Sequence, residues 1–187
     1  MRNLAVSLSI AALSLFGAVA CSSGSDNASS SKDSTTTTAS ATTVAPSTSP
    51  STPGTHCATD QLKGSLGDTQ SGAGQRYTVL ILTNTGTKAC DLRGFPGVSL
   101  VDSSGKQIGQ PASREGTEGP TVLIQPGQST SATLHTSAAG MGASCDPTSA
   151  QVRVYPPDNT ASLTITAAYS ACGGFQVTTL VSGAAGN

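Results

Sequence analysis

From about residue 55 onward, the sequence consists of short apolar runs separated by turn residues at intervals of 8–15 positions. Apolar runs of this length between frequent turns are typical of β-strands, and no window of ten or more residues has helical periodicity. The candidate strands are residues 77–83, 97–101, 106–110, 121–125, 129–134, 151–155, 163–168 and 176–181. This pattern predicts an all-β fold, an immunoglobulin-like β-sandwich over residues 56–183, with an isolated barrel as the alternative.

Local motifs refine this prediction. Residues 102–105 (DSSG) are expected to form a hairpin turn, and residues 126–127 (Pro-Gly) a turn between two other strands. The alternating Ser and Thr residues of the segment 129–134 indicate an edge or half-exposed strand. Phe95 is expected to lie in the core, where it would anchor the turn that follows Cys90.

The core must be built almost without aromatic side chains, because aromatics are 3% of the sequence and Trp is absent. Disulfides should therefore matter more to stability. Cys57, Cys90, Cys145 and Cys172 form an even set that allows three pairings. We favour the local pairing, Cys57–Cys90 and Cys145–Cys172, because it crosslinks each end of the sandwich separately. In the chain-entropy approximation each such loop contributes roughly 3.5–4 kcal/mol.

The N-terminus has the features of an export signal. Arg2 precedes a charge-free apolar run over residues 4–20, which is shorter than the roughly 20 residues of a spanning helix. We expect a signal peptide at residues 1–20, with a permanent anchor helix as the alternative. Residues 18–21 (Ala-Val-Ala-Cys) resemble the bacterial lipobox, which implies that Cys21 is acylated. Because the same residues satisfy the ordinary A-x-A cleavage rule, a secreted product is the competing interpretation.

Residues 21–55 have the composition of a linker. The segment after Cys21 is rich in Ser, Thr and Pro, and its only large apolar residue is Val44. Such a sequence buries too little apolar surface to offset the entropy of ordering, so we expect a disordered tether. Segments of this composition are also substrates for O-glycosylation, although a plain spacer explains the composition equally well.

A block of the predicted domain resembles a known family. The residues that carry the resemblance are Asn84-Thr85-Gly86, the run Cys90-Asp91-Leu92-Arg93-Gly94-Phe95-Pro96-Gly97-Val98-Ser99-Leu100, Asp102, Gly105, Leu123, Pro126-Gly127, Cys145 and Cys172. They are similar to the actinobacterial family of domains of unknown function numbered 4232, over about residues 57–181. The resemblance implies an exported or lipoprotein β-domain behind a linker. It implies no activity, so the resemblance assigns no functional residue to this sequence.

The sequence offers little support for several kinds of chemistry. Net charge is −1 and the nine Lys and Arg residues are scattered, so no basic footprint for nucleic acid is expected. The two histidines are His56, at the linker junction, and His135, and no G-x-S-x-G motif accompanies them. His135, Met141 and Cys145 lie within eleven residues, but copper ligation would need a free thiolate and a second histidine. We expect no metal site and no cofactor.

The most charged segment of the domain is a candidate contact surface. Arg114, Glu115 and Glu118 lie in a Gly-rich stretch, residues 114–120, that is most simply a solvated loop. Loops on rigid sandwiches often carry binding sites.

Together these features predict a lipoprotein on the outer face of the cytoplasmic membrane, anchored in the bilayer through acylated Cys21. Its domain is expected to be a non-enzymatic binding module for an envelope protein, a wall polymer or a small ligand. The alternatives are an envelope hydrolase centred on His135 and a passive surface protein.

Overall fold

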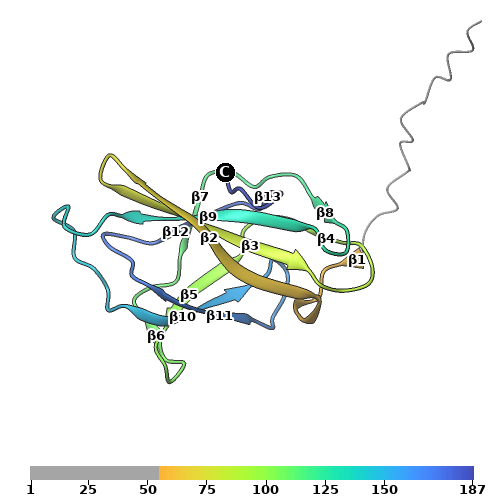
Figure 1. Ribbon diagram of the computed structural model, residues 1–187, viewed down its shortest axis with the longest axis horizontal. Helices are drawn as coiled ribbons and strands as arrows, with labels where there is room; N and C mark the ends of the chain where they lie inside the picture. The colour runs from red at the N-terminus through yellow and green to blue at the C-terminus, as the bar shows by residue number, and fades with distance from the viewer. Residues whose placement is uncertain (1–54) are drawn as a thin grey trace, which may run out of the picture. The chain divides into compact units, whose positions relative to one another are not determined.

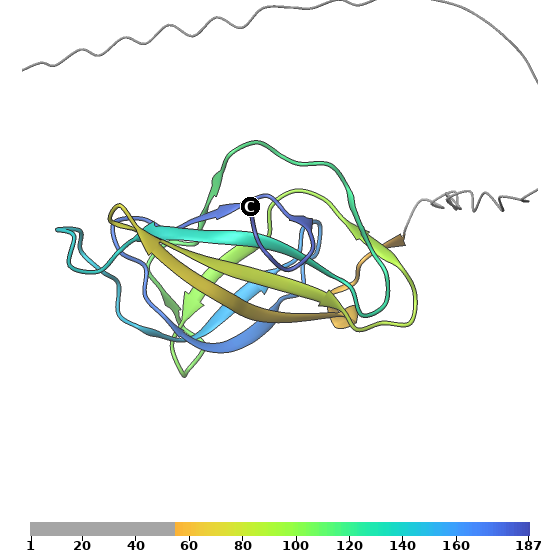
Figure 2. The ribbon, with the colours of Figure 1, turned by 45° about the horizontal axis from the view of Figure 1, so that its top comes forward.

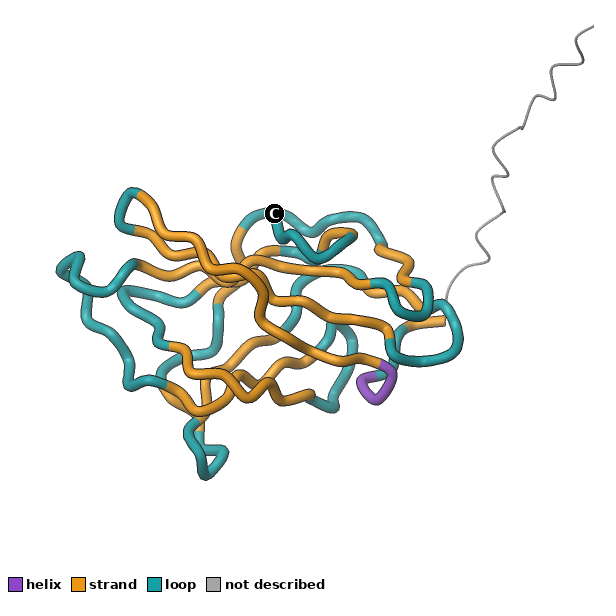
Figure 3. Tube along the Cα trace, in the orientation of Figure 1, coloured by secondary structure: helices purple, strands orange, loops and turns teal. Residues whose placement is uncertain are grey.

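A computed structural model of the protein describes residues 55–187. The predicted signal peptide, Cys21 and the linker up to residue 54 lie outside these residues. Strands and loops make up the described region, with one 3₁₀ turn, η1 (Thr59–Gln61) (Figure 3). The strands are β1 (Thr55–His56), β2 (Leu62–Gly72), β3 (Gln75–Asn84), β4 (Cys90–Leu92), β5 (Gly97–Val101), β6 (Gln107–Ile108), β7 (Ser113–Glu115), β8 (Val122–Ile124), β9 (Ser129–Ser137), β10 (Ser149–Tyr155), β11 (Leu163–Tyr169), β12 (Gln176–Thr178) and β13 (Val181–Ser182).

The strands form two large sheets and one small sheet. The first large sheet has the order β2-β3-β9-β12-β7, and β13 also pairs with β9. The second has the order β11-β10-β5-β6, and the small sheet has the order β1-β4-β8. Neighbouring strands are antiparallel except in the β12–β7 and β1–β4 pairs, which are parallel. Figures 1 and 2 show the two large sheets facing one another.

The core lies between the two large sheets because alternate residues of their strands point inward. Leu80 and Leu82 of β3 and Leu134 of β9 share one buried cluster with Val152 and Val154 of β10. All five are completely buried. The period of two that the sequence shows is therefore the period of one buried face. The predicted all-β, immunoglobulin-like sandwich is confirmed, and within residues 55–187 no helix is long and apolar enough to cross a membrane.

Both disulfides are formed with the local pairing expected from the sequence, but they differ in burial. Cys57–Cys90 connects the residue after β1 to the start of β4, and both cysteines are buried within the core cluster. Cys145–Cys172 connects a loop to a residue next to the core, and Cys145 is exposed. The first disulfide is part of the core and the second lies at its surface.

The prediction that residues 129–134 form an edge or half-exposed strand is wrong. Strand β9 is central, because it pairs with β3 on one side and with β12 and β13 on the other. Its buried hydroxyl groups have partners in the C-terminal part of the chain: Thr130 Oγ1 donates to Val181 O at 2.7 Å, Thr136 Oγ1 donates to Cys172 O at 2.8 Å, and Ser131 Oγ accepts from the N–H of Gly186 at 2.9 Å. Buried hydroxyls with partners are compatible with a core position.

The DSSG turn between β5 and β6 is organised by one carboxylate. Asp102 Oδ1 accepts hydrogen bonds from Ser104 Oγ at 2.6 Å, from the backbone N–H of Ser104 at 2.8 Å and from that of Lys106 at 3.0 Å. The Ser104 hydroxyl first, and then the backbone donors, lower the pKa of the Asp102 carboxyl. Gly105 closes the turn with a φ of 82°, which only glycine adopts readily.

Candidate functional site

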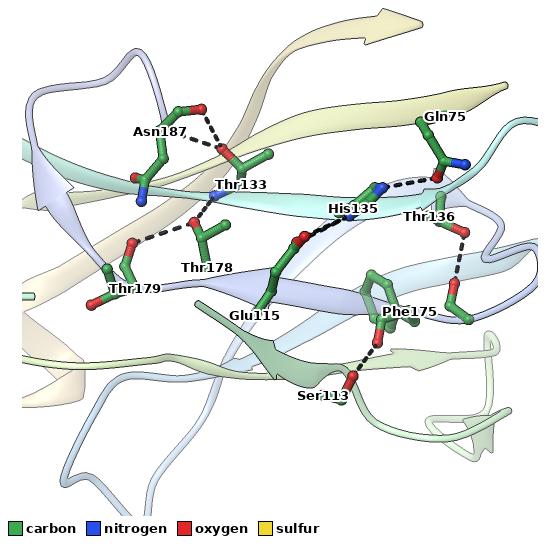
Figure 4. Close-up of polar contacts among 11 residues, drawn as sticks. Gln75, Ser113, Glu115, Thr133, His135, Thr136, Phe175, Thr178, Thr179 and Asn187 are labelled. Atoms are coloured by element: carbon green, nitrogen blue, oxygen red, sulfur yellow. Dashed lines mark hydrogen bonds and ion pairs between the residues drawn. The ribbon is translucent and has the colours of Figure 1, made fainter. Parts of the chain in front are cut away.

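His135 lies on the outer face of the six-stranded sheet and is bonded at both ring nitrogens. Its Nδ1 donates to the Glu115 carboxylate, 3.0 Å from Oε2, and its Nε2 lies 2.9 Å from Gln75 Oε1 (Figure 4). The His135 side chain is only 16% exposed. These contacts fix the orientation of the imidazole ring.

Strand register brings these residues together across the sheet. His135 of β9 is opposite Tyr77 of β3 and Gln176 of β12, and Gln176 is in turn opposite Ser113 of β7. Glu115 lies two residues after Ser113, so its side chain is on the same face of the sheet and reaches back to the imidazole. The His135–Glu115 hydrogen bond therefore connects the edge strand β7 to the central strand β9.

Tyr77 completes this cluster. Its ring stacks on that of His135, with centroids 4.5 Å apart and an interplanar angle of 20°. Tyr77 is nevertheless 41% exposed, and apart from Met141 it is the one large hydrophobic residue so exposed among residues 55–187. An aromatic ring that is held in place and still accessible is suited to contact with a ligand.

A hollow of about 240 Å³ adjoins the imidazole. Its lining includes Gln75, His135 and Gln176 on the sheet and Gly174 and Phe175 from the chain before β12. Polar contacts fix its rim: Ser113 Oγ donates to Phe175 O at 3.3 Å, and the Thr136 hydroxyl lies 2.8 Å from Gly174 O and shares its one hydrogen between this carbonyl and that of Cys172 (Figure 4). The lining is predominantly polar.

The predicted contact loop is divided between two places. Arg114 and Glu118 line a second hollow, of about 350 Å³, together with Arg93, Phe95 and Asp158. Arg93 Nε donates to Glu118 Oε1 at 2.7 Å. The Arg114 guanidinium lies 5.6 Å from the centre of the Phe95 ring. This second hollow is charged and polar.

Two expectations for this region are wrong. Within the predicted loop, residues 114–120, Arg114 and Glu115 belong to strand β7, because the edge of β12 offers backbone partners for a parallel strand. Glu115 turns to His135 and does not join Arg114. Phe95 is half-buried and not a core residue, because it faces the hollow beneath Arg114.

His56 is held more firmly than its junction position suggests. Its Nε2 donates to Pro157 O at 2.8 Å, and Nδ1 lies 3.7 Å from Asp91 Oδ1. Asn159 Nδ2 also donates to Cys57 O at 3.0 Å. These bonds connect the first strand of the domain to the loop after β10.

The two catalytic or metal arrangements considered from the sequence can be compared with this geometry. Cys145 is oxidised, so it supplies no thiolate for copper beside His135 and Met141. Across residues 55–187, no three His, Cys, Asp or Glu side chains come together as a metal site would require. His135 has the carboxylate that a hydrolase would need, but in this part of the chain its second nitrogen meets the amide of Gln75 and no hydroxyl.

Sequence reasoning missed Gln75 and Tyr77. The signal that could have found Tyr77 is the alternation along the strand, which places residues 77, 79 and 81 on the face opposite the buried Leu80 and Leu82. The contact with His135 is a pairing across strands 58 residues apart in the chain, and no local pattern predicts it.

Comparison with known proteins gives one family. Residues 57–184 match a family whose description is "Domain of unknown function (DUF4232)". The match covers the whole sandwich and more than half of the chain, and it agrees with the resemblance seen around residues 84–105. No curated protein and no solved structure matches the chain significantly.

Proposed function

The chain belongs to the DUF4232 family, whose description assigns no activity, and we propose that it is a membrane-anchored lipoprotein with a non-enzymatic binding domain. The observation that carries the binding role is the arrangement around His135. Both ring nitrogens are engaged, by Glu115 and by Gln75, so the imidazole has no free nitrogen with which to activate a nucleophile. The same contacts fix the stacked ring of Tyr77 at an accessible position.

The proposed location is the outer face of the cytoplasmic membrane. Two disulfides support it, because such bonds persist in oxidising compartments outside the cytosol. The lipobox-like residues before Cys21 supply the anchor, and diacylation provides the two chains that stable attachment requires. The linker would then hold the sandwich away from the lipid surface.

Replacing the acylated residue tests the anchor. We expect Cys21→Ser to abolish incorporation of a palmitate analogue and to move the protein from the membrane fraction into the medium, because Ala18 and Ala20 still allow ordinary cleavage. The matched control is Ser22→Ala, which leaves the lipobox intact and should keep both label and membrane attachment. Equal labelling of Cys21→Ser and the parent chain would contradict the proposal.

Site-specific crosslinking tests the binding role. A photoreactive residue at Gln176, beside the imidazole, is expected to give a discrete crosslinked product in native membranes. The same residue at Thr164, exposed on β11 of the opposite sheet, serves as the control and should give none. Absence of any product at Gln176, or an identical pattern at both positions, would favour a passive surface protein.

A further inference from the structure

A third hollow lies beside Tyr77 on the outer face of the six-stranded sheet. Its volume is about 280 Å³, at the small end of the roughly 300–1,000 Å³ of ligand pockets, so it suits a single ring-sized group. We call it the Tyr77 hollow, and the residues that define it are Asp68, Gln70, Tyr77, Val79, Thr133, Ala185 and Asn187.

A β-bulge supplies the acidic side of this hollow. The register between β2 and β3 shifts between Leu66 and Thr69, so that Gly67 and Asp68 both lie opposite Val79. Glycine fits closely there, since a Cβ atom at position 67 would lie 2.9 Å from Cδ1 of Ile81 and the end of that side chain would have to move. Bulges of this kind redirect side chains next to binding sites.

The opposite side is formed by the C-terminal segment. The backbone N–H of Gly186 donates to Ser131 Oγ at 2.9 Å, and that of Asn187 donates to Thr133 Oγ1 at 3.1 Å. Residues 183–187 therefore lie over β9 (Figure 2; the contact with Thr133 is drawn in Figure 4). These bonds occupy Thr133, so the hydrogen-bonding capacity that faces the hollow belongs to the other side chains.

That capacity is unused within the described part of the chain. No hydrogen bond or ion pair between residues 55–187 engages the side chains of Asp68, Gln70 or the Tyr77 hydroxyl. The carboxylate and amide groups of β2, and the Tyr77 hydroxyl on the adjacent β3, can accept hydrogen bonds from and donate them to neighbouring hydroxyl groups of one ligand. Val79 and the Tyr77 ring add an apolar surface beside these polar groups.

We propose that the Tyr77 hollow binds one neutral pyranose ring of a cell-envelope glycan. A sugar ring presents hydroxyl groups at its edge and C–H groups on its faces. The hydroxyl groups need planar polar partners, and the C–H groups pack on the face of an aromatic ring, which carries negative charge density. Asp68, Gln70 and Tyr77 provide both kinds of partner in a space of one ring. This ligand class rests on the proposed binding role and specifies it.

The charge of the Tyr77 hollow favours a neutral ligand over an anionic one. Asp68 is the one charged side chain among the seven residues of the Tyr77 hollow, and it is negative. A phosphate, a uronic acid or a nucleotide would place an anion beside it, which is unfavourable. The arginines of the domain's second hollow line a different surface. The hollow therefore favours a neutral sugar over acidic wall polymers and nucleotides.

The test is an NMR titration of the full mature chain, solubilised from membranes in detergent. The neutral probes are maltotetraose and the tetrasaccharide of N-acetylglucosamine, and the anionic probe is tetragalacturonic acid. We expect a neutral probe to shift the Tyr77 ring and Gln70 amide resonances in a saturable manner, and the anionic probe to have no effect. A second measurement distinguishes a wall glycan from a free sugar as the natural ligand. It compares co-sedimentation of the protein with insoluble cell walls in the absence and presence of free glucose as a competitor.

Three variants at two residues locate the site. Asp68→Ala removes an exposed side chain without a protein partner, so it should leave the melting temperature unchanged while weakening sugar binding about tenfold. Tyr77→Ala should weaken binding at least as much, whereas Tyr77→Phe keeps the ring and most of the affinity. Binding that is equal in Asp68→Ala, Tyr77→Ala and the parent chain would overturn the assignment of the site.

The outcomes also separate this inference from the proposed function. Failure of both neutral probes and of cell walls to bind, with the crosslink at Gln176 retained, would overturn the sugar assignment and leave the binding role in place. Failure of the probes together with loss of the crosslink would overturn both.

Discussion

Replacing Cys57 and Cys90 with alanine is expected to destabilise the domain by about 3–5 kcal/mol, a large share of the roughly 5–15 kcal/mol typical of small domains. Two effects add. Without the crosslink, the unfolded chain gains the conformational entropy that the disulfide removes by closing a loop between cysteines 33 positions apart. The substitution also removes two sulfur atoms from residues that are 0% and 1% exposed, which leaves a cavity in the core beside β4.

The second disulfide is the matched control. Cys145 and Cys172 are separated by 27 positions, so the entropic effect of their removal is nearly the same. Cys145 is exposed, however, and only Cys172 is buried, so packing is lost at one cysteine and not at two. We therefore expect the double alanine variant at 145 and 172 to be clearly more stable than that at 57 and 90.

Equilibrium denaturation in urea measures both free energies of unfolding. A second measurement uses the intact protein: a mild reductant should open Cys145–Cys172 first, because Cys145 is exposed whereas both cysteines of the other disulfide are buried. Equal destabilisation by the two double variants, or earlier reduction of Cys57–Cys90, would contradict the distinction between a core and a surface disulfide.

Patterns that depend on neighbouring residues predicted the fold well. Residues 97–101 are a strand with the predicted bounds, and residues 102–105 form the predicted turn. The local disulfide pairing was also correct. The strand and the turn are each determined by a few neighbouring residues. The disulfides were predicted from an even number of cysteines in a chain with few aromatics. Along a strand, the period of two shows directly which side is buried.

Features that depend on residues distant in the sequence were missed or wrongly predicted. Strand β2 contains Gly64, Gly67 and Asp68, which have low β propensity, and it forms because β3 provides a continuous ladder of partners. Strand β9 looked half-exposed because it is rich in Ser and Thr. Its hydroxyl groups are buried because partners from the C-terminal part of the chain reach them, as at Thr130 and Ser131, and no local pattern in residues 129–134 reports those partners.

The candidate site was predicted in part for the same reason. His135 and Glu115 were both identified as candidates, but as parts of different hypotheses. Their contact crosses β12, so it follows from the order of strands in the sheet. The Tyr77 hollow was missed because it depends on a bulge, which changes the face on which Asp68 lies without changing its neighbours in sequence.

Asn84 accounts for part of the family pattern in physical terms. It is the first residue of the Asn-Thr-Gly motif and is completely buried. Its side-chain Nδ2 donates to Lys88 O at 2.8 Å and to Ile124 O at 3.0 Å, and its Oδ1 accepts from the N–H of Gly86 at 2.9 Å. One amide therefore holds the loop between β3 and β4 and connects it to β8.

Replacing Asn84 with alanine is expected to destabilise the domain by about 3–5 kcal/mol, because it leaves two carbonyl groups and one N–H without their partner at roughly 1–3 kcal/mol each. Asn84→Asp should be at least as damaging at neutral pH, since it keeps an acceptor for Gly86 but directs a carboxylate at two carbonyl oxygens. The control is the adjacent Thr85→Ala, which removes one exposed hydrogen bond to Gln61 O and should change stability by less than about 1 kcal/mol. Urea denaturation compares the three variants. A loss of under about 1 kcal/mol in Asn84→Ala would mean that water replaces the amide at these groups, and the motif would then need another explanation.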